Sequence, residues 1–220
     1  MRRAAALPRH PADLLAAVIT LSLVIACRAP ARSVVAAPIQ QGSVVVVSHE
    51  GSTNAAKENA VTAGGRAYLW SRPGTLRLYV QRESSLAGWS PRHLELVDEA
   101  VQAWMRGNAV RVAIVSWAYE ADIRLYWTDR LPSTNPGITM LYSNAGDRLT
   151  RADMFIAVRP APWDIGTPDR VLFATIAHEL GHALGLPHDP SPFVLMHASP
   201  LVTKVTDVDL ARLDALLHGA

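Results

Sequence analysis

Apolar and polar residues first alternate between residues 75 and 81, a pattern typical of a strand with one buried face. Residues 110–115 and 121–127 are short, largely apolar stretches, and we predict that they form strands too. Ser90 and Pro91 are predicted to open a helix between the first two strands, as its N-cap and first-turn proline. That helix has one apolar stripe, formed by Leu94, Val97, Val101 and Trp104. Because a helix joins them, these strands are expected to be parallel.

Two more helices are predicted further along the chain. Thr167 and Pro168 supply a cap and a first-turn proline for one whose apolar body contains Val171, Phe173, Ala174 and Ala177. Thr206 and Asp209 form a capping-box-like pair that opens a final helix with Leu210, Leu213, Leu216 and Leu217. Between these helices and the earlier strands, residues 137–143 and 149–158 flank a turn-rich tetrad and are predicted to form a hairpin.

The start of the chain differs in character from the rest. Arg2, Arg3 and Arg9 precede an apolar run over residues 14–26, which is too short to span a bilayer but typical of a signal peptide. The run ends on a small residue followed by Cys27, the single cysteine of the chain. This exit resembles the bacterial lipoprotein signal, in which cleavage before the cysteine leaves that residue to carry lipid. An ordinary secretory signal with an incidental cysteine is the alternative.

We therefore divide the chain into a signal peptide (1–26), a lipid-anchored tether or short pro-segment (27–66) and a catalytic domain (67–220). The tether is rich in small residues and has no aromatic residue, although the apolar residues 44–47 allow one strand within it. His49 and Glu50 are interpreted as a solvated linker pair. These features predict an exported protein at the cell membrane or outer membrane, facing the periplasm or the exterior, or else a secreted one.

The charge balance excludes one class of partner. The whole chain has a formal net charge of +2, but the three early arginines and only one acidic residue, Asp13, lie before Cys27. The remainder is formally neutral, so there is no electrostatic case for binding nucleic acid. We expect a monomer.

The motif that indicates a chemical function most specifically lies between residues 176 and 196. His178 and His182 are four residues apart, so on a helix their imidazoles share one face and can bind one ion. Glu179 follows the first histidine, and a carboxylate there projects beside the metal, where it can take a proton from water. A chance pattern on a core helix, with histidines that are simply hydrogen-bonded, is the alternative.

Gly185 and His188 extend the pattern to a third ligand. A helix ends most readily on a left-handed glycine, and the chain must turn back at Gly185 if His188 is to reach the metal. Pro187 prevents the helix from restarting. Three neutral imidazoles and one water would complete a tetrahedral Zn²⁺ site of the catalytic type, with Zn–N distances of about 2.0–2.1 Å.

The complete pattern HExxHxxGxxH, with Met196 downstream, resembles the metzincin zinc peptidases, most closely the matrixin branch (matrix-metalloproteinase type). The segment HDPSPFVLM, from His188 to Met196, has the matrixin spacing, and residues 121–127 resemble a matrixin strand. The resemblance implies an α+β fold with an α/β-type upper subdomain. Its parts would be a mixed twisted sheet with an antiparallel edge strand, an active-site helix, a methionine turn beneath the metal and a C-terminal helix. Zinc peptidases with a later glutamate ligand are excluded, because no glutamate follows Glu179.

In matrixins the strand that corresponds to residues 137–143 is the antiparallel edge strand that lines the cleft. An exposed edge is unfavourable unless it has a use, and pairing an extended substrate through backbone hydrogen bonds would be that use. A short protected edge is the alternative.

This sequence also departs from the matrixin pattern. Matrixins bind a structural zinc through histidines ahead of the metal helix, but none lies between His93 and His178, so no structural zinc is expected. Calcium binding is a second possibility that the sequence leaves undecided. Four aspartates could contribute ligands, but their spacing does not match a calcium-binding loop: Asp147, Asp153, Asp164 and Asp169. The propeptide cysteine that blocks the zinc in matrixins has no counterpart here, since Cys27 is the only cysteine.

The sequence thus predicts a zinc endopeptidase that hydrolyses peptide bonds of proteins outside the cytoplasm. The ligands would be His178, His182 and His188, with Glu179 as general base and Met196 as the floor of the site. A membrane-tethered zinc protein that binds a partner without turnover is the alternative. The presence of Glu179 argues against it, because a purely structural site needs no base.

Overall fold

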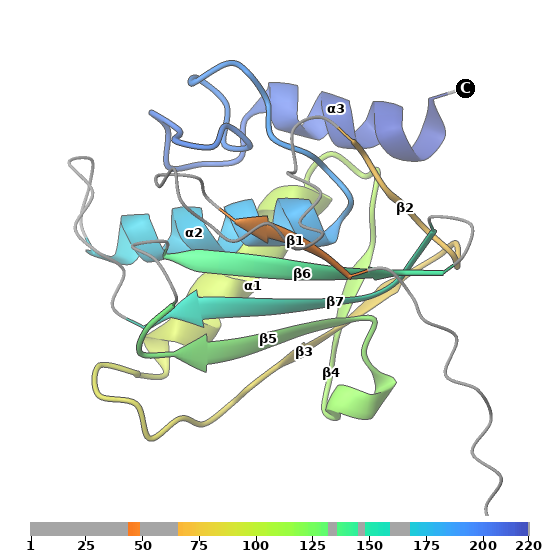
Figure 1. Cartoon of the computed structure of the whole chain (residues 1–220). Helices are drawn as coiled ribbons and strands as arrows, with labels where there is room; N and C mark the ends of the chain where they lie inside the picture. Colours follow the sequence, from red (N-terminus) through yellow and green to blue (C-terminus); the bar gives the residue numbers. More distant parts are fainter. Residues whose placement is uncertain (1–43, 49–65, 132–135, 145–147, 159–167, 220) are drawn as a thin grey trace, which may run out of the picture. The chain divides into compact units, whose positions relative to one another are not determined.

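A mixed β-sheet organises the part of the chain described by the computed structural model, residues 44–48, 66–131, 136–144, 148–158 and 168–219. The seven-stranded sheet has the order β1-β6-β7-β5-β3-β4, and β2 pairs with β7 off this path (Figure 1). Its strands are β1 (Val44–Ser48), β2 (Leu69–Trp70), β3 (Leu76–Val80), β4 (Val112–Val115), β5 (Ile123–Thr128), β6 (Gly137–Ser143) and β7 (Arg148–Ala157).

The predicted parallel crossover is confirmed. β3 pairs in parallel with both β4 and β5, and β5 pairs in parallel with β7. Helix α1 (Arg92–Met105) connects β3 to β4, and a short 3₁₀ helix, η1 (Ala118–Glu120), precedes β5. The predicted hairpin is also present, because β6 and β7 pair in antiparallel fashion. Parallel and antiparallel strands with accompanying helices make this an α+β fold.

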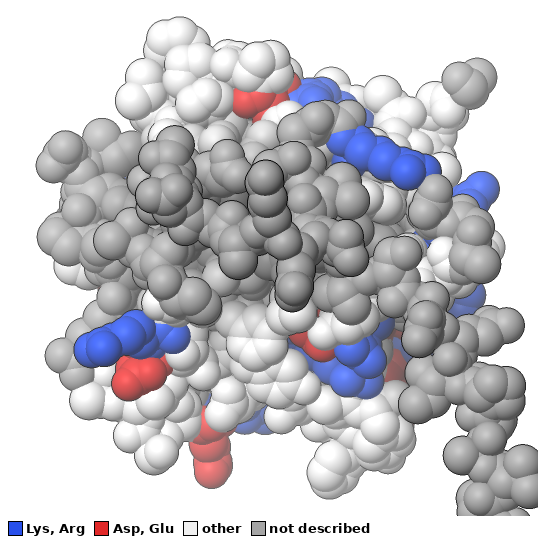
Figure 2. Space-filling model, in the orientation of Figure 1, with Lys and Arg blue, Asp and Glu red and all other residues white. Residues whose placement is uncertain are grey.

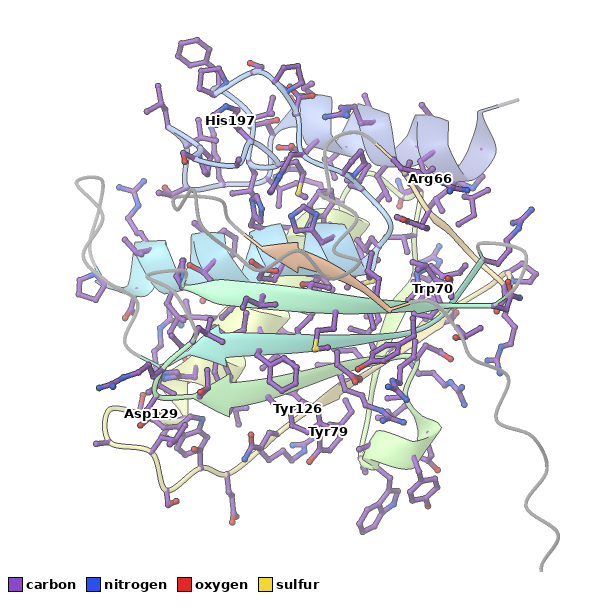
Figure 3. All side chains as sticks on the ribbon, viewed as in Figure 1. Arg66, Trp70, Tyr79, Tyr126, Asp129 and His197 are labelled. Carbon is purple, nitrogen blue, oxygen red and sulfur yellow. The ribbon has the colours of Figure 1, made fainter. Side chains whose placement is uncertain are left out.

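The core lies between the sheet and the helices α1 and α2 (Pro168–Ala183). Alternate strand residues such as Leu78 and Leu125 are buried there, while Tyr79 and Tyr126 lie side by side on the other face, with ring centroids 6.0 Å apart (Figure 3). Trp104 joins the two helices, since its indole N–H donates to the carbonyl of Ala177 at 2.8 Å.

The predicted start of α1 is wrong in one detail. Ser90 does not cap the helix, because Pro91 occupies the N-cap position and no side chain accepts from the first turn. Both the amide nitrogen and the hydroxyl oxygen of Ser90 lie near Nδ1 of the buried His93, at 3.3 and 3.2 Å. The stripe of α1 is also centred differently: Leu96 and Ala100 are buried in the core, whereas Leu94 is only partly buried.

Helix α3 (Asp207–His218) closes the described chain. The predicted capping box is confirmed, with the Thr206 hydroxyl accepting from the backbone N–H of Asp209 and the Asp209 carboxylate accepting from that of Thr206. Leu210 and Leu213 are buried. Thr167, the predicted cap of α2, lies outside the described residues.

Residues 137–143 do not form the last strand of the sheet, as the antiparallel edge strand was expected to; of the two readings left open for this edge, an exposed one and a protected one, the structure has a covered edge. β6 has a partner on each side, β7 and β1. The residues that cover this edge come from the predicted tether, where residues 44–47 allowed a strand. Four of these five residues are valines, a residue type that favours extended backbone and therefore suits a strand.

The described residues carry side chains of both charges on their surface. On the face shown in Figure 2, basic and acidic side chains of these residues lie interspersed. Among them there is no helix with the length and apolar character needed to cross a bilayer. The predicted signal peptide and Cys27 fall outside the described part of the chain.

Candidate metal centre

Helix α2 brings the first two predicted ligands together. His178 and His182 are both buried, one turn apart, with ring centroids separated by 4.6 Å. The end of this helix is fixed by Trp70 of β2 (labelled in Figure 3), whose indole N–H donates to the carbonyl of Ala183 at 3.1 Å. A carbonyl that would lack a helical partner is thereby satisfied, and the histidine-bearing turns are held against the sheet.

Gly185 ends the helical segment as predicted, with a φ of +106°. Its amide donates to the carbonyl of His182, and its own carbonyl accepts from the amide of Tyr68. A Cβ at this position would lie only 2.0 Å from the Tyr68 carbonyl oxygen, so both the backbone angle and the space require glycine. The chain then reverses toward His188.

The three predicted histidines converge on one point. Each offers a nitrogen within 4.8 Å of the others, and they are the one such group of three or more His, Cys, Asp or Glu side chains in the described part of the chain. Nε2 of His188 lies 3.3 Å from Nε2 of His178 and 3.1 Å from Nε2 of His182.

Backbone carbonyls orient two of these rings. Nδ1 of His178 lies 2.7 Å from the carbonyl of Leu195, and Nδ1 of His182 lies 2.8 Å from the carbonyl of Leu186. Because a carbonyl only accepts, each Nδ1 must carry the proton, and each Nε2 then points a lone pair at the shared centre. This arrangement is typical of metal-binding histidines.

The trio fits a zinc ion. Tetrahedral coordination at about 2.0–2.1 Å separates ligand nitrogens by about 3.3 Å, close to the spacing found here. Without a metal, two lone pairs would face the third ring, which can donate a proton to only one of them. A cation at the centre satisfies all three nitrogens at once.

Met196, the predicted floor of the site, packs against α2. It is buried, and a Cβ added to Gly181, the residue before His182, would come within 2.3 Å of its sulfur atom. Contact this close explains why a glycine lies between the two histidines of α2.

Asp209 of α3 holds the methionine segment in place, a role that the sequence did not reveal. The carboxylate is fully buried and accepts from the amides of Leu195 and Met196, at 3.0 and 3.1 Å. Since the carbonyl of Leu195 orients His178, Asp209 acts on a predicted ligand through one intervening residue. Its capping signal was readable in the sequence, but its contact with a distant loop was not.

Glu179, the residue after His178, lies against β6. The side chain is fully buried, one carboxylate oxygen lies 2.7 Å from the hydroxyl of Thr139, and the other has no hydrogen-bond partner among the described residues. Burial raises the pKa of Glu179 to about 8, and the hydrogen bond from Thr139 only partly opposes this. Gly137 contacts the same side chain, because a Cβ there would be 2.6 Å from Cγ of Glu179. Neither β6 residue was identified from the sequence, because the resemblance placed residues 137–143 along the cleft without indicating which of them contact α2.

Of the four candidate calcium ligands, the two that the structure describes each pair with an arginine. Asp153 pairs with Arg151 and Asp169 pairs with Arg92, at 3.2 and 3.0 Å. The other two aspartates lie outside the described residues, as do His49 and Glu50.

Comparison with known proteins gives one informative similarity. No model of a known protein family matches the chain. The chain is 34% identical over 107 residues to human matrix metalloproteinase-20, an alignment that covers 46% of this chain and 22% of that protein. The chain thus spans less than a quarter of its relative. This distant similarity and the group of three histidines agree in pointing to a domain that resembles matrixins and could hold a metal ion.

Proposed function

We propose that this protein is a zinc-dependent endopeptidase that cleaves proteins outside the bacterial cytoplasm. The observation that carries the proposal is the convergence of three histidine nitrogens next to a buried glutamate, one oxygen of which has no hydrogen-bond partner among the described residues. The similarity to a matrix metalloproteinase supports the same reading. His178, His182 and His188 would hold the ion.

The chain's own residues account for the proton transfers. When bound, zinc supplies Lewis-acid chemistry that polarises the scissile carbonyl and makes a water molecule acidic near neutral pH. Glu179 takes the proton from the attacking water and returns it to the leaving amine. Thr139 holds one oxygen of this carboxylate, and the other has no hydrogen-bond partner among the described residues and could accept a proton from water. Burial raises the pKa of Glu179, whereas a bound cation would favour its carboxylate, so this side chain is suited both to accept and to return a proton.

A binding protein without turnover is the second candidate. It would need the histidines but not a carboxylate beside them. A fully buried carboxylate with one unsatisfied oxygen destabilises a fold, and residues of this kind are found where function requires them. This observation favours the peptidase.

The test is cleavage of an unstructured fluorogenic peptide by the purified full chain, before and after chelation and zinc return. We expect about one zinc per chain and chelator-sensitive cleavage. Glu179→Gln should keep the zinc and lose roughly 10²–10⁴-fold in turnover. Glu83→Gln, which changes an exposed glutamate after β3, is the matched control and should cleave normally. Normal cleavage by Glu179→Gln would require a different base, and zinc retention without any cleavage by the wild type would favour the binding protein.

A further inference from the structure

β1 covers the edge of the sheet beside the candidate site. It pairs with β6 in antiparallel fashion over its whole length, from Val44 opposite Tyr142 to Ser48 opposite Ile138. Figure 1 shows β1 (orange) beside β6, and the order of the sheet makes β1 its last strand on this side. Residues from the start of the chain therefore occupy the backbone positions that β6 would otherwise offer to another peptide.

The covered part of β6 is also the part that touches the proposed base. Thr139, whose hydroxyl lies 2.7 Å from the Glu179 carboxylate, is the register partner of Val47. Gly137, which packs against the same glutamate, precedes Ile138, the partner of Ser48. The C-terminal end of β1 therefore lies one strand away from the residues that would carry out hydrolysis.

We propose that β1 is an internal competitor that occupies the peptide-binding edge of β6 and must leave before a substrate can pair there. The inference rests on the proposed function for the identity of the substrate, an extended peptide. It rests on the pairing of β1 with β6 for the competition. Each outward N–H and C=O of β6 can pair with only one neighbouring strand, so β1 and a second extended peptide exclude each other.

Two properties suit β1 to this role. Four successive valines give it a strong preference for extended backbone, so it pairs well with an edge. It is nevertheless only five residues long, so few backbone hydrogen bonds hold it. Because it belongs to the same chain, it competes at an effective concentration of about millimolar order. This restraint needs no cysteine, and the chain contains none after Cys27.

The experiment removes β1 pairing from the full chain. In an antiparallel pair alternate residues point their N–H groups at the partner, so Val45→Pro/Val46→Pro removes a donor that faces β6 whichever of the two it is. Val45→Ile/Val46→Ile is the matched control, because isoleucine keeps both donors and the extended preference. Zinc content and thermal unfolding of both variants establish that the domain is folded.

Binding is measured separately from cleavage. In a Glu179→Gln background, a labelled valine-rich peptide of about ten residues should bind the proline variant at least tenfold more tightly than the isoleucine variant. A synthetic peptide with the sequence of residues 43–48 should displace the label from the proline variant. With Glu179 restored, kcat/KM for peptide cleavage should rise at least tenfold in the proline variant.

The outcomes separate this inference from the proposed function. Tighter peptide binding without cleavage by any variant supports the competition and contradicts the peptidase. Equal peptide affinity in folded proline and isoleucine variants overturns the competition even if both cleave. If the double proline prevents folding, Val45→Pro and Val46→Pro are tested singly, because one of the two removes a donor that faces β6. Equal peptide affinity in both folded single variants and the isoleucine control, or failure of the 43–48 peptide to displace the label from either, also overturns the inference.

Discussion

A single residue, Glu179, combines the two features that distinguish this site from a structural metal centre. It is adjacent in sequence to a histidine of the trio, and its carboxylate is fully buried with one unpartnered oxygen. Burial favours the neutral acid, whereas a bound cation favours the carboxylate. Zinc binding and the protonation state of Glu179 are therefore coupled. In the metal-free protein, the pKa of Glu179 should be raised by burial without the opposing effect of a cation.

The first prediction concerns pH in the metal-free protein. The pKa of Glu179 is raised from an ordinary 4.5 to about 8, so between these values the folded state holds a proton that the unfolded state has released. The contribution to stability is therefore greatest at low pH and is lost as the pH rises through about 8. Between about pH 6 and pH 7.5 the chelated wild type should lose about 2 kcal/mol relative to Glu179→Gln. Urea unfolding at both pH values measures it, and parallel losses in the two proteins would contradict it.

The second prediction concerns Asp209. Asp209→Ala leaves the amides of Leu195 and Met196 buried without acceptors, which should lower the free energy of unfolding by about 3 kcal/mol. Because Leu195 orients His178, zinc affinity should also fall about 10–100-fold. Asp207→Ala, on an exposed residue of the same helix, is the control and should change neither quantity substantially. Competition with a fluorescent chelator measures the affinity, and an unchanged value would show that Met196 and His178 are held by other contacts.

Residue spacing predicted those parts of the site that are close in sequence. His178, His182 and Gly185 belong to one helix and its end, where periodicity fixes which side chains share a face. Thr139, Gly137 and Asp209 reach the site from β6 and α3 through long-range packing. Local patterns contain no information on such contacts, so these residues became visible only in the folded structure.

At the scale of elements, the end of α2 determines whether His188 can join the other two ligands. Gly185 and Gly74 have nearly the same positive φ, +106° and +108°, but different surroundings. A Cβ at Gly74 would meet nothing within 4 Å, whereas at Gly185 it would meet the Tyr68 carbonyl at 2.0 Å. Substituting each of the two glycines therefore distinguishes the effect of an unfavourable backbone angle from the effect of a steric clash.

The third prediction uses this pair. Gly74→Ala should lower the free energy of unfolding by about 1–2 kcal/mol, the effect of an unfavourable backbone angle. Gly185→Ala should lower it by about 2 kcal/mol more and should weaken zinc binding, because the Tyr68 backbone or the turn to His188 must move. Thermal unfolding and zinc titration of both variants provide the comparison. Equal losses would mean that the turn relaxes without disturbing the site.

The sequence predicted the helices and strands themselves better than it predicted which strands pair with each other. The alternating and helical patterns identified β3, β4, β5, α1 and the β6–β7 hairpin, because side-chain periodicity reflects which face is buried. Strand pairing depends on backbone groups that every residue has, so the sequence did not show that β1 covers β6. The cap of α1 was also predicted at the wrong residue. Ser90 contacts Nδ1 of the buried His93 instead of capping the helix, and a local pattern does not show this contact.

At the scale of the whole molecule, the beginning of the chain contains both the predicted lipid anchor, Cys27, and the strand β1 that pairs with β6. β1 reaches the sheet from the predicted tether, and Cys27 precedes it in the same segment. While β1 is paired, only residues 28–43 separate Cys27 from the sheet, and release of β1 would lengthen this connection. A membrane anchor and a covered substrate edge would then be linked through one stretch of chain.

The last prediction concerns that anchor. Cys27 directly follows a small residue at the end of an apolar run, and as the single cysteine it cannot form an intramolecular disulfide. Lipid on Cys27 would replace the hydrophobic segment lost at cleavage, because each buried CH₂ contributes about 0.8 kcal/mol and several acyl chains hold far longer than one. The native protein should therefore fractionate with membranes and incorporate labelled fatty acid.

Cys27→Ser should abolish the fatty-acid label and yield soluble or uncleaved protein. Zinc content and peptide cleavage should be unchanged once the protein is purified, because the three histidines and Glu179 belong to α2 and the turn that follows it. A native protein that is soluble, with a mature N-terminus beyond Cys27, would replace the anchor with ordinary secretion. Loss of zinc in Cys27→Ser would instead tie the start of the chain to the metal centre, which the anchor hypothesis does not allow.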